Sequence, residues 1–100
     1  MQTDSLLTGP VIVTRYLGPT NHRGSRVVAT HRRDSSRSNC HPWRKALSWD
    51  HQLSSEANHQ AAAQALLDSW PYETDLQIVG RGHDAEAYYW LTVSRSLLEA

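Results

Sequence analysis

The fold is decided by one stretch of the chain, VIVTRYLGPTNHRGSRVVATH, which covers residues 11–31. Its first part, Val11–Leu17, is rich in β-branched and aromatic residues, which is typical of a strand. Side chains alternate along a strand, so Val11, Val13 and Arg15 share one of its faces. Strand character returns from Arg26 to about residue 32, after eight residues that carry turn signals. The stretch therefore predicts two antiparallel strands joined as a hairpin.

The connector between these strands, residues 18–25, admits two interpretations. In the first it is a shaped hairpin loop in which Asn21 and Gly24 adopt positive φ. In the second its successive backbone N–H groups bind an anion, and Arg23 and Arg26 add positive charge. Both interpretations assign the loop to the same residues: Gly18, Pro19, Asn21, Arg23, Gly24 and Arg26.

A third strand and a helix are predicted further along. Residues 43–50 alternate in polarity and place two tryptophans on one face, which predicts a half-buried strand. Ser54 or Ser55 can cap a helix, and Glu56 favours its first turn. Helical spacing then gives one apolar stripe, which ends before Pro71 and consists of Ala62, Ala63, Leu66, Leu67 and Trp70.

Two more strands complete the pattern, at residues 76–79 and 86–93, with a turn predicted at Gly80–Asp84. Large apolar groups on both faces of the last strand indicate that it has neighbours on both sides. We therefore expect an α+β fold: a mainly antiparallel sheet of four to five strands in the order β-β-β-α-β-β, with one helix packed on a face.

A chain of 100 residues and 11.3 kDa fits one domain. We expect a loose N-terminal arm at residues 1–10, a single α+β domain at 11–93 with a flexible basic loop at 32–42, and a C-terminal tail at 94–100. No apolar run reaches membrane-spanning length, and no signal peptide is evident at the N-terminus. With Cys40 as the single cysteine, these features predict a cytoplasmic protein without a disulfide.

Charge is distributed unevenly although the net charge is zero. Residues 1–48 hold eight of the ten Lys and Arg residues, and residues 49–100 hold eight of the ten Asp and Glu residues. Such an asymmetry is typical of proteins that bind nucleic acid or a charged partner. The alternative is that the two halves interleave in the fold and neutralise each other.

The residues that could carry catalysis form no recognisable pattern. No Gly-x-Ser-x-Gly motif places a serine on a strand-to-helix turn. The six histidines and Cys40 lack the spacing of metal ligands, and Cys40 is interpreted as an accessible thiol. The segment Gly80–His83 precedes a strand, whereas a dinucleotide site requires a helix there. We expect a protein that is not an enzyme and that uses no metal and no cofactor.

The run from Tyr16 to Arg26, YLGPTNHRGSR, resembles the signature Tyr-Leu-Gly-Pro-Thr-Asn-x-Arg-Gly-Ser-Arg of a group of small proteins associated with bacteriophages, plasmids and bacterial genomes. In that group the run joins two strands and an Ala-rich helix follows. Residues 58–63 here are similar to the start of that helix, and Tyr88–Trp90 to its last strand. The chain departs from the group at residues 32–43, where it has a longer basic loop. The resemblance implies a mobile-element setting and no particular activity.

Two functions are consistent with this sequence. The first is a non-enzymatic phage or mobile-element accessory protein that binds a host protein or nucleoprotein complex, in the manner of a counter-defence (anti-CRISPR-like) inhibitor. The alternative is a nucleic-acid-binding accessory protein that holds single strands with the basic segment 32–45 and its tryptophan, Trp43. A second copy of the chain is a further partner to consider. The candidate partner-binding residues are Arg32, Arg33, Arg37, Trp43, Arg44, Lys45, Glu73, Asp75, Asp84 and Glu86.

Overall fold

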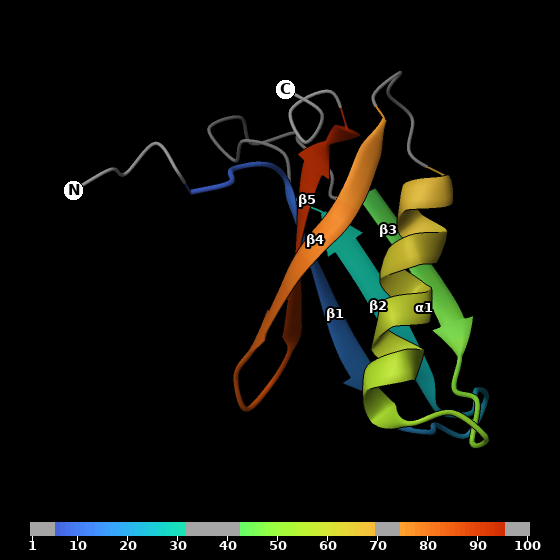
Figure 1. Cartoon of the computed structure of the whole chain (residues 1–100). Coiled ribbons are helices and arrows are strands. Elements are labelled where there is room, and N and C mark those ends of the chain that lie inside the picture. The colour runs from blue at the N-terminus through green and yellow to red at the C-terminus, as the bar shows by residue number, and fades with distance from the viewer. Residues whose placement is uncertain (1–5, 32–42, 70–74, 96–100) are drawn as a thin grey trace, which may run out of the picture.

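The computed structural model describes residues 6–31, 43–69 and 75–95. Within these ranges the chain forms, in order, β1 (Val11–Leu17), β2 (Arg26–His31), β3 (Trp43–Ser48), α1 (Ser55–Asp68), β4 (Leu76–His83) and β5 (Tyr88–Ser94). The strands form one sheet in the order β3-β2-β1-β5-β4, and every neighbouring pair is antiparallel. The helix α1 lies against one face of this sheet (Figure 1). The predicted α+β class and element order are therefore confirmed.

Strand β1 occupies the centre of the sheet and pairs with elements from both ends of the domain. It forms the expected hairpin with β2, where Thr14 lies opposite Ala29. On its other side it pairs with β5, where Ile12 lies opposite Trp90. The backbone N–H of Thr92 continues this pairing by donating to the Pro10 carbonyl, 3.0 Å away. The large apolar groups on both faces of β5 predicted that it has two neighbours, and it lies between β1 and β4.

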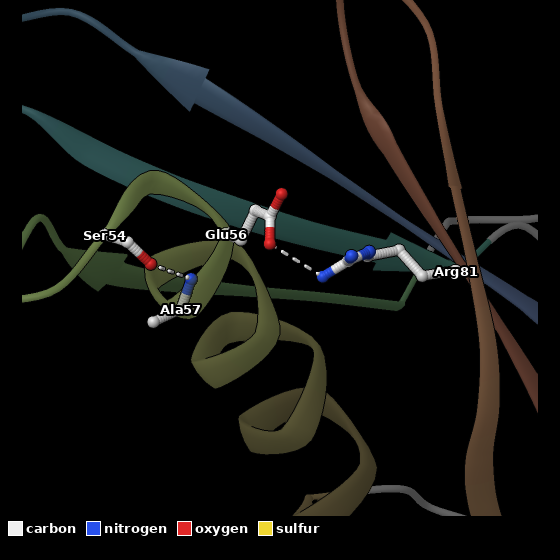
Figure 2. Close-up of polar contacts among 4 residues, drawn as sticks. All are labelled: Ser54, Glu56, Ala57 and Arg81. Carbon is white, nitrogen blue, oxygen red and sulfur yellow. Dashed lines mark hydrogen bonds and ion pairs between the residues drawn. The ribbon is translucent and has the colours of Figure 1, made fainter.

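Helix α1 begins as predicted. The Ser54 side chain caps it, because its hydroxyl accepts a hydrogen bond of 3.1 Å from the Ala57 N–H. Figure 2 shows this cap and, in the first turn, Glu56 directed toward Arg81 of β4, with 3.0 Å between the carboxylate and the guanidinium. Both side chains of this ion pair are largely exposed, so it contributes little to stability.

The core forms where α1 meets the sheet. Small side chains on the helix let it approach the strands closely, and Leu66 fills the space between them. The fully buried cluster consists of Ile12, Val27, Ala29, Ala62, Ala63, Leu66 and Trp90. Three residues of the predicted stripe, Ala62, Ala63 and Leu66, belong to this core, Leu67 is half-buried against it, and Trp70 lies outside the described residues.

The opposite face of the sheet carries the alternate side chains, which in β1 are Val11, Val13, Arg15 and Leu17. Among the described residues no helix covers it, and we call it the helix-free face. No helix in the described ranges has both the length and the apolar character needed to cross a membrane.

The predicted turn at Gly80–Asp84 is wrong. Strand β4 continues to His83, and both Gly80 and Gly82 pair with residues of β5. An irregularity between Ile78 and Gly80 absorbs one residue and lets the pairing continue. The turn lies further on, where the Asp84 N–H donates to the Ala87 carbonyl over 3.0 Å. Pairing with β5 therefore outweighs the local preference of the two glycines.

Leu66→Ala should lower the free energy of unfolding by roughly 2–5 kcal/mol, because the truncation leaves a cavity between α1 and the sheet. Chemical denaturation measures this loss. Gln60→Ala, on the exposed side of the same helix, is the matched control and should change stability by less than about 0.5 kcal/mol. Equal effects of the two substitutions would contradict the observed helix face.

Candidate anion-binding face

Three arginines from three neighbouring strands lie on the helix-free face. In the β1–β2 register Arg15 is opposite Val28, and in the β2–β3 register Thr30 is opposite Arg44. Paired residues point to the same face, and so do residues two apart along one strand. Arg15 of β1, Arg26 of β2 and Arg44 of β3 therefore project from the side opposite α1.

A shallow hollow lies between two of these arginines. Its volume is about 210 Å³, and Arg15, Leu17, Val28, Thr30 and Arg44 line it. Arg15 and Arg44 are exposed, whereas Val28 is buried. The hollow therefore combines an apolar floor with two solvent-accessible guanidinium groups.

In the described part of β1, β2, β3 and the β1–β2 connector, every Asp, Glu, Lys or Arg side chain is basic. Residues 6–31 and 43–48 contain no Asp or Glu, and their five cations are Arg15, Arg23, Arg26, Arg44 and Lys45. Within the described ranges, none of these five takes part in an ion pair, since the two pairs present join Arg81 to Glu56 and Arg95 to Asp75. The sheet order keeps β1, β2 and β3 adjacent, so the two halves of the chain do not interleave on the helix-free face.

Two of the acidic candidate residues, Asp75 and Asp84, contact other groups of the molecule. The carboxylate of Asp84 accepts hydrogen bonds from the Tyr89 hydroxyl at 2.7 Å and from the backbone N–H groups of Glu86 and Ala87. These bonds, that of Tyr89 foremost, hold the pKa of Asp84 below its usual value, and the bond to Asp84 raises the pKa of Tyr89. Asp75 lies 3.4 Å from the Arg95 guanidinium. Glu86 is exposed.

The basic candidates are only partly brought together. Arg44 and Lys45 are both exposed, but adjacent residues of a strand point to opposite faces, so only Arg44 reaches the helix-free face. Trp43 is the first residue of β3. Four of the candidates, Arg32, Arg33, Arg37 and Glu73, lie outside the described residues.

Arg15 was not among the predicted site residues. The alternation of β1 already placed it on one face with Val11 and Val13, but that face is identified only by the strand pairing. Trp90 of β5 is 2% exposed, so its ring belongs to the core and not to a binding surface.

A buried polar network on the helix side accounts for the position of Trp90. The Trp90 indole N–H donates to the Thr14 hydroxyl oxygen at 2.9 Å, and this hydroxyl lies 2.8 Å from Nδ1 of His59 in α1. His59 also lies against Tyr88, with 4.4 Å between ring centroids, and edge-on to Trp49. Burial lowers the pKa of His59, and the hydrogen bond with Thr14 partly opposes this effect. The only indication of this network along the sequence is the polar pair Asn58 and His59, which interrupts the run of apolar helix residues.

The connector between β1 and β2 is shaped differently from the prediction. No described residue has positive φ, so neither Asn21 nor Gly24 adopts the left-handed conformation expected. Instead the Thr20 hydroxyl accepts hydrogen bonds from the backbone N–H groups of His22 and Arg23, at 3.3 and 3.0 Å. The Thr20 N–H in turn donates to the Arg23 carbonyl over 2.7 Å. A local side-chain motif therefore turns the chain without a special backbone conformation.

Comparison with known proteins leaves this face to be interpreted from its own geometry. No family model, curated protein or solved structure matches the chain. Among the described residues, no three His, Cys, Asp or Glu side chains are grouped so as to hold a metal ion. The resemblance of residues 16–26 to phage- and plasmid-associated proteins stays a prediction.

The burial of His59 predicts a pH dependence of stability. Because its pKa is lower in the folded state, the unfolded chain binds more protons between the two values. Stability is therefore fully present above the unfolded value of about 6.5 and falls as the pH drops below it. Denaturant titrations between about pH 8 and pH 5 should give a steeper loss for the wild-type protein than for His59→Gln. Equal slopes would contradict the desolvation of His59.

Proposed function

We propose that the protein is a non-enzymatic binding protein that docks on nucleic acid through its helix-free face. One observation carries the proposal: Arg15, Arg26 and Arg44 project from three neighbouring strands on one face, and the described part of those strands holds no acidic residue. Clustered cations that form no ion pair among the described residues are the electrostatic footprint of a protein that binds a polyanion.

The spacing of the three arginines supports an extended, flexible strand as the ligand. Neighbouring strands are about 4.8 Å apart, and residues two apart along a strand are separated by roughly 6.8 Å. The Cα atoms of Arg15 and Arg26 are thus roughly 8 Å apart, and those of Arg15 and Arg44 about 12 Å. These spacings are comparable with those between phosphates one or two nucleotides apart.

Other groups on the helix-free face are suited to contact with the bases of a nucleic acid. Tyr89 lies opposite Val13 in the β1–β5 register and is half-buried, so it offers an aromatic ring beside Arg15. Aromatic rings next to cations are typical of single-strand binding surfaces, because every base has a face that can stack. The partly apolar hollow between Arg15 and Arg44 provides a further surface on which a base can be shielded from water.

The mobile-element setting implied by residues 16–26 suggests where such a nucleic acid occurs. A host nucleoprotein complex exposes its nucleic acid, and a small protein that occupies it would inhibit the complex, which is the counter-defence role. Inhibition through an acidic surface that mimics nucleic acid has weaker support. Glu56 and Asp75 are in ion pairs, and the Asp84 carboxylate closes the β4–β5 turn.

The double variant Arg15→Ala/Arg44→Ala should bind a labelled single-stranded oligonucleotide more weakly, for all sequences alike, in fluorescence anisotropy titrations. Its plot of log affinity against log salt should be flatter than that of the wild-type protein by roughly 1.4, or about 0.7 for each lost phosphate contact.

Arg81→Ala/Arg95→Ala is the matched control, since it removes the same charge from the other half of the sheet. It should keep most of the affinity and the salt slope of the wild-type protein. Equal weakening by the two double variants, or a wild-type protein that does not bind the oligonucleotide at low salt, would refute the proposed face. Inhibition of a host complex that survives Arg15→Ala/Arg44→Ala would assign the function to another surface.

A further inference from the structure

The β1–β2 connector meets the chain after β3 at one end of the sheet (Figure 1). Residues of these two segments line a larger basic hollow. The Trp49 N–H donates to the Ser25 carbonyl over 3.0 Å and holds these two segments together. The hollow has a volume of about 510 Å³, which is within the range of small-molecule sites. Its lining includes Arg23, Gly24, Ser25, Arg26, Leu47 and Trp49. We call it the Arg26 pocket.

The guanidinium of Arg26 has an unmet hydrogen-bonding requirement. Its Nε atom is buried and has no hydrogen-bond partner in the part of the chain that the structure describes. Its Nη1 atom makes a long contact of 3.5 Å with the Gly24 carbonyl. A buried N–H of a charged group is costly to leave unpaired, so such an atom calls for a specific partner. Arg26 lines the pocket, and the planar fork of its guanidinium matches a phosphate.

Gly24 provides a second, independent observation. It has no positive φ, and a Cβ built on it would meet no atom within 4 Å. Neither backbone conformation nor packing therefore requires glycine at this position. Close approach of a ligand to the backbone is another use of glycine, and Gly24 lines the pocket.

Contacts around the pocket join its lining to the sheet and to the core. The Tyr16 hydroxyl and Ser25 Oγ are hydrogen-bonded at 2.9 Å, which fastens the connector to β1. The Trp49 ring lies edge-on to Tyr16 at 5.0 Å and to His59 at 6.0 Å, so one wall is anchored in the core. A site formed before its ligand arrives loses less conformational entropy on binding.

We propose that the Arg26 pocket binds a nucleoside phosphate, with Arg23 and Arg26 on the phosphate group. The pocket is larger than one phosphate, and Leu47 and Trp49 give part of it an apolar lining suited to a base or sugar. Arg26 belongs both to this pocket and to the helix-free face. The nucleoside phosphate is thus the 5′-phosphorylated end of a strand that lies along that face, a part of the inference that rests on the proposed function.

Calorimetric titrations of the full chain should compare adenosine 5′-monophosphate, adenosine and inorganic phosphate. Anisotropy titrations should compare one oligonucleotide with and without a 5′-phosphate. Adenosine 5′-monophosphate should bind at least about tenfold more tightly than either fragment, and the 5′-phosphate should strengthen oligonucleotide binding by a similar factor. Equal binding of adenosine 5′-monophosphate and inorganic phosphate would overturn the nucleoside assignment.

Two substitutions test the residues. Gly24→Ala should leave the melting temperature unchanged, because its Cβ meets open space, but should weaken phosphate binding about tenfold. Arg26→Lys keeps the charge but removes Nε and the fork, and should weaken phosphate binding by a similar factor. Arg81→Lys, the same change in β4 and outside both the pocket and the proposed face, is the control and should leave the preference for a 5′-phosphate intact. Unaltered phosphate affinity in both Gly24→Ala and Arg26→Lys would overturn the pocket.

The results separate this inference from the proposed function. Salt-dependent oligonucleotide binding with no preference for a 5′-phosphate, and no binding of adenosine 5′-monophosphate, would overturn the pocket and leave the basic face standing. Binding of adenosine 5′-monophosphate without any oligonucleotide binding would keep the pocket as a mononucleotide site and refute the nucleic-acid function.

Discussion

The buried hydroxyl of Thr14 links three elements of the fold through hydrogen bonds. It accepts the indole N–H of Trp90 and is hydrogen-bonded to Nδ1 of His59, so a single buried oxygen joins β1, β5 and α1. A hydroxyl offers one donor and two acceptor sites, which is enough to satisfy both partners. A shift of β1 by one residue would leave both partners unpaired and direct Arg15 into the core, so the network fixes the register of the central strand.

The same register determines where charge is displayed. With Thr14 directed toward α1, Arg15 must point away from it, and the hairpin pairing then brings Arg26 and Arg44 to the same side. The β4–β5 hairpin joins the free edge of β1 and not that of β3. Because of this topology, the three strands from the basic half of the sequence stay contiguous and present one surface.

Periodicity in the sequence predicted most of the fold, and its failures have physical causes. The alternation in β1 and β3, the Ser54 cap and the apolar stripe of α1 each reflect a local rule that tertiary packing leaves intact. The two glycines of β4 indicated a turn, but a bulge and pairing with β5 override that preference. The candidate site was harder to predict from the sequence. The charge asymmetry was evident, but the position of Arg15 depends on strand register. The Arg26 pocket depends on chain segments that meet only in the folded state. The role of His59 was not predicted, because its partner Thr14 is 45 residues away in sequence.

The pairing of β1 with β5 also constrains how the chain reaches its native state. Thr14 and Trp90 are 76 residues apart, so their contact closes a long loop whose entropy must be lost before the contact contributes. Contacts of such sequence separation slow folding. During synthesis β1, β2, β3 and α1 are complete well before β5 emerges, and until then the free edge of β1 and the pocket for the Trp90 ring are open to other chains. When β5 pairs with β1, it covers this exposed edge, and the tendency of the domain to aggregate falls.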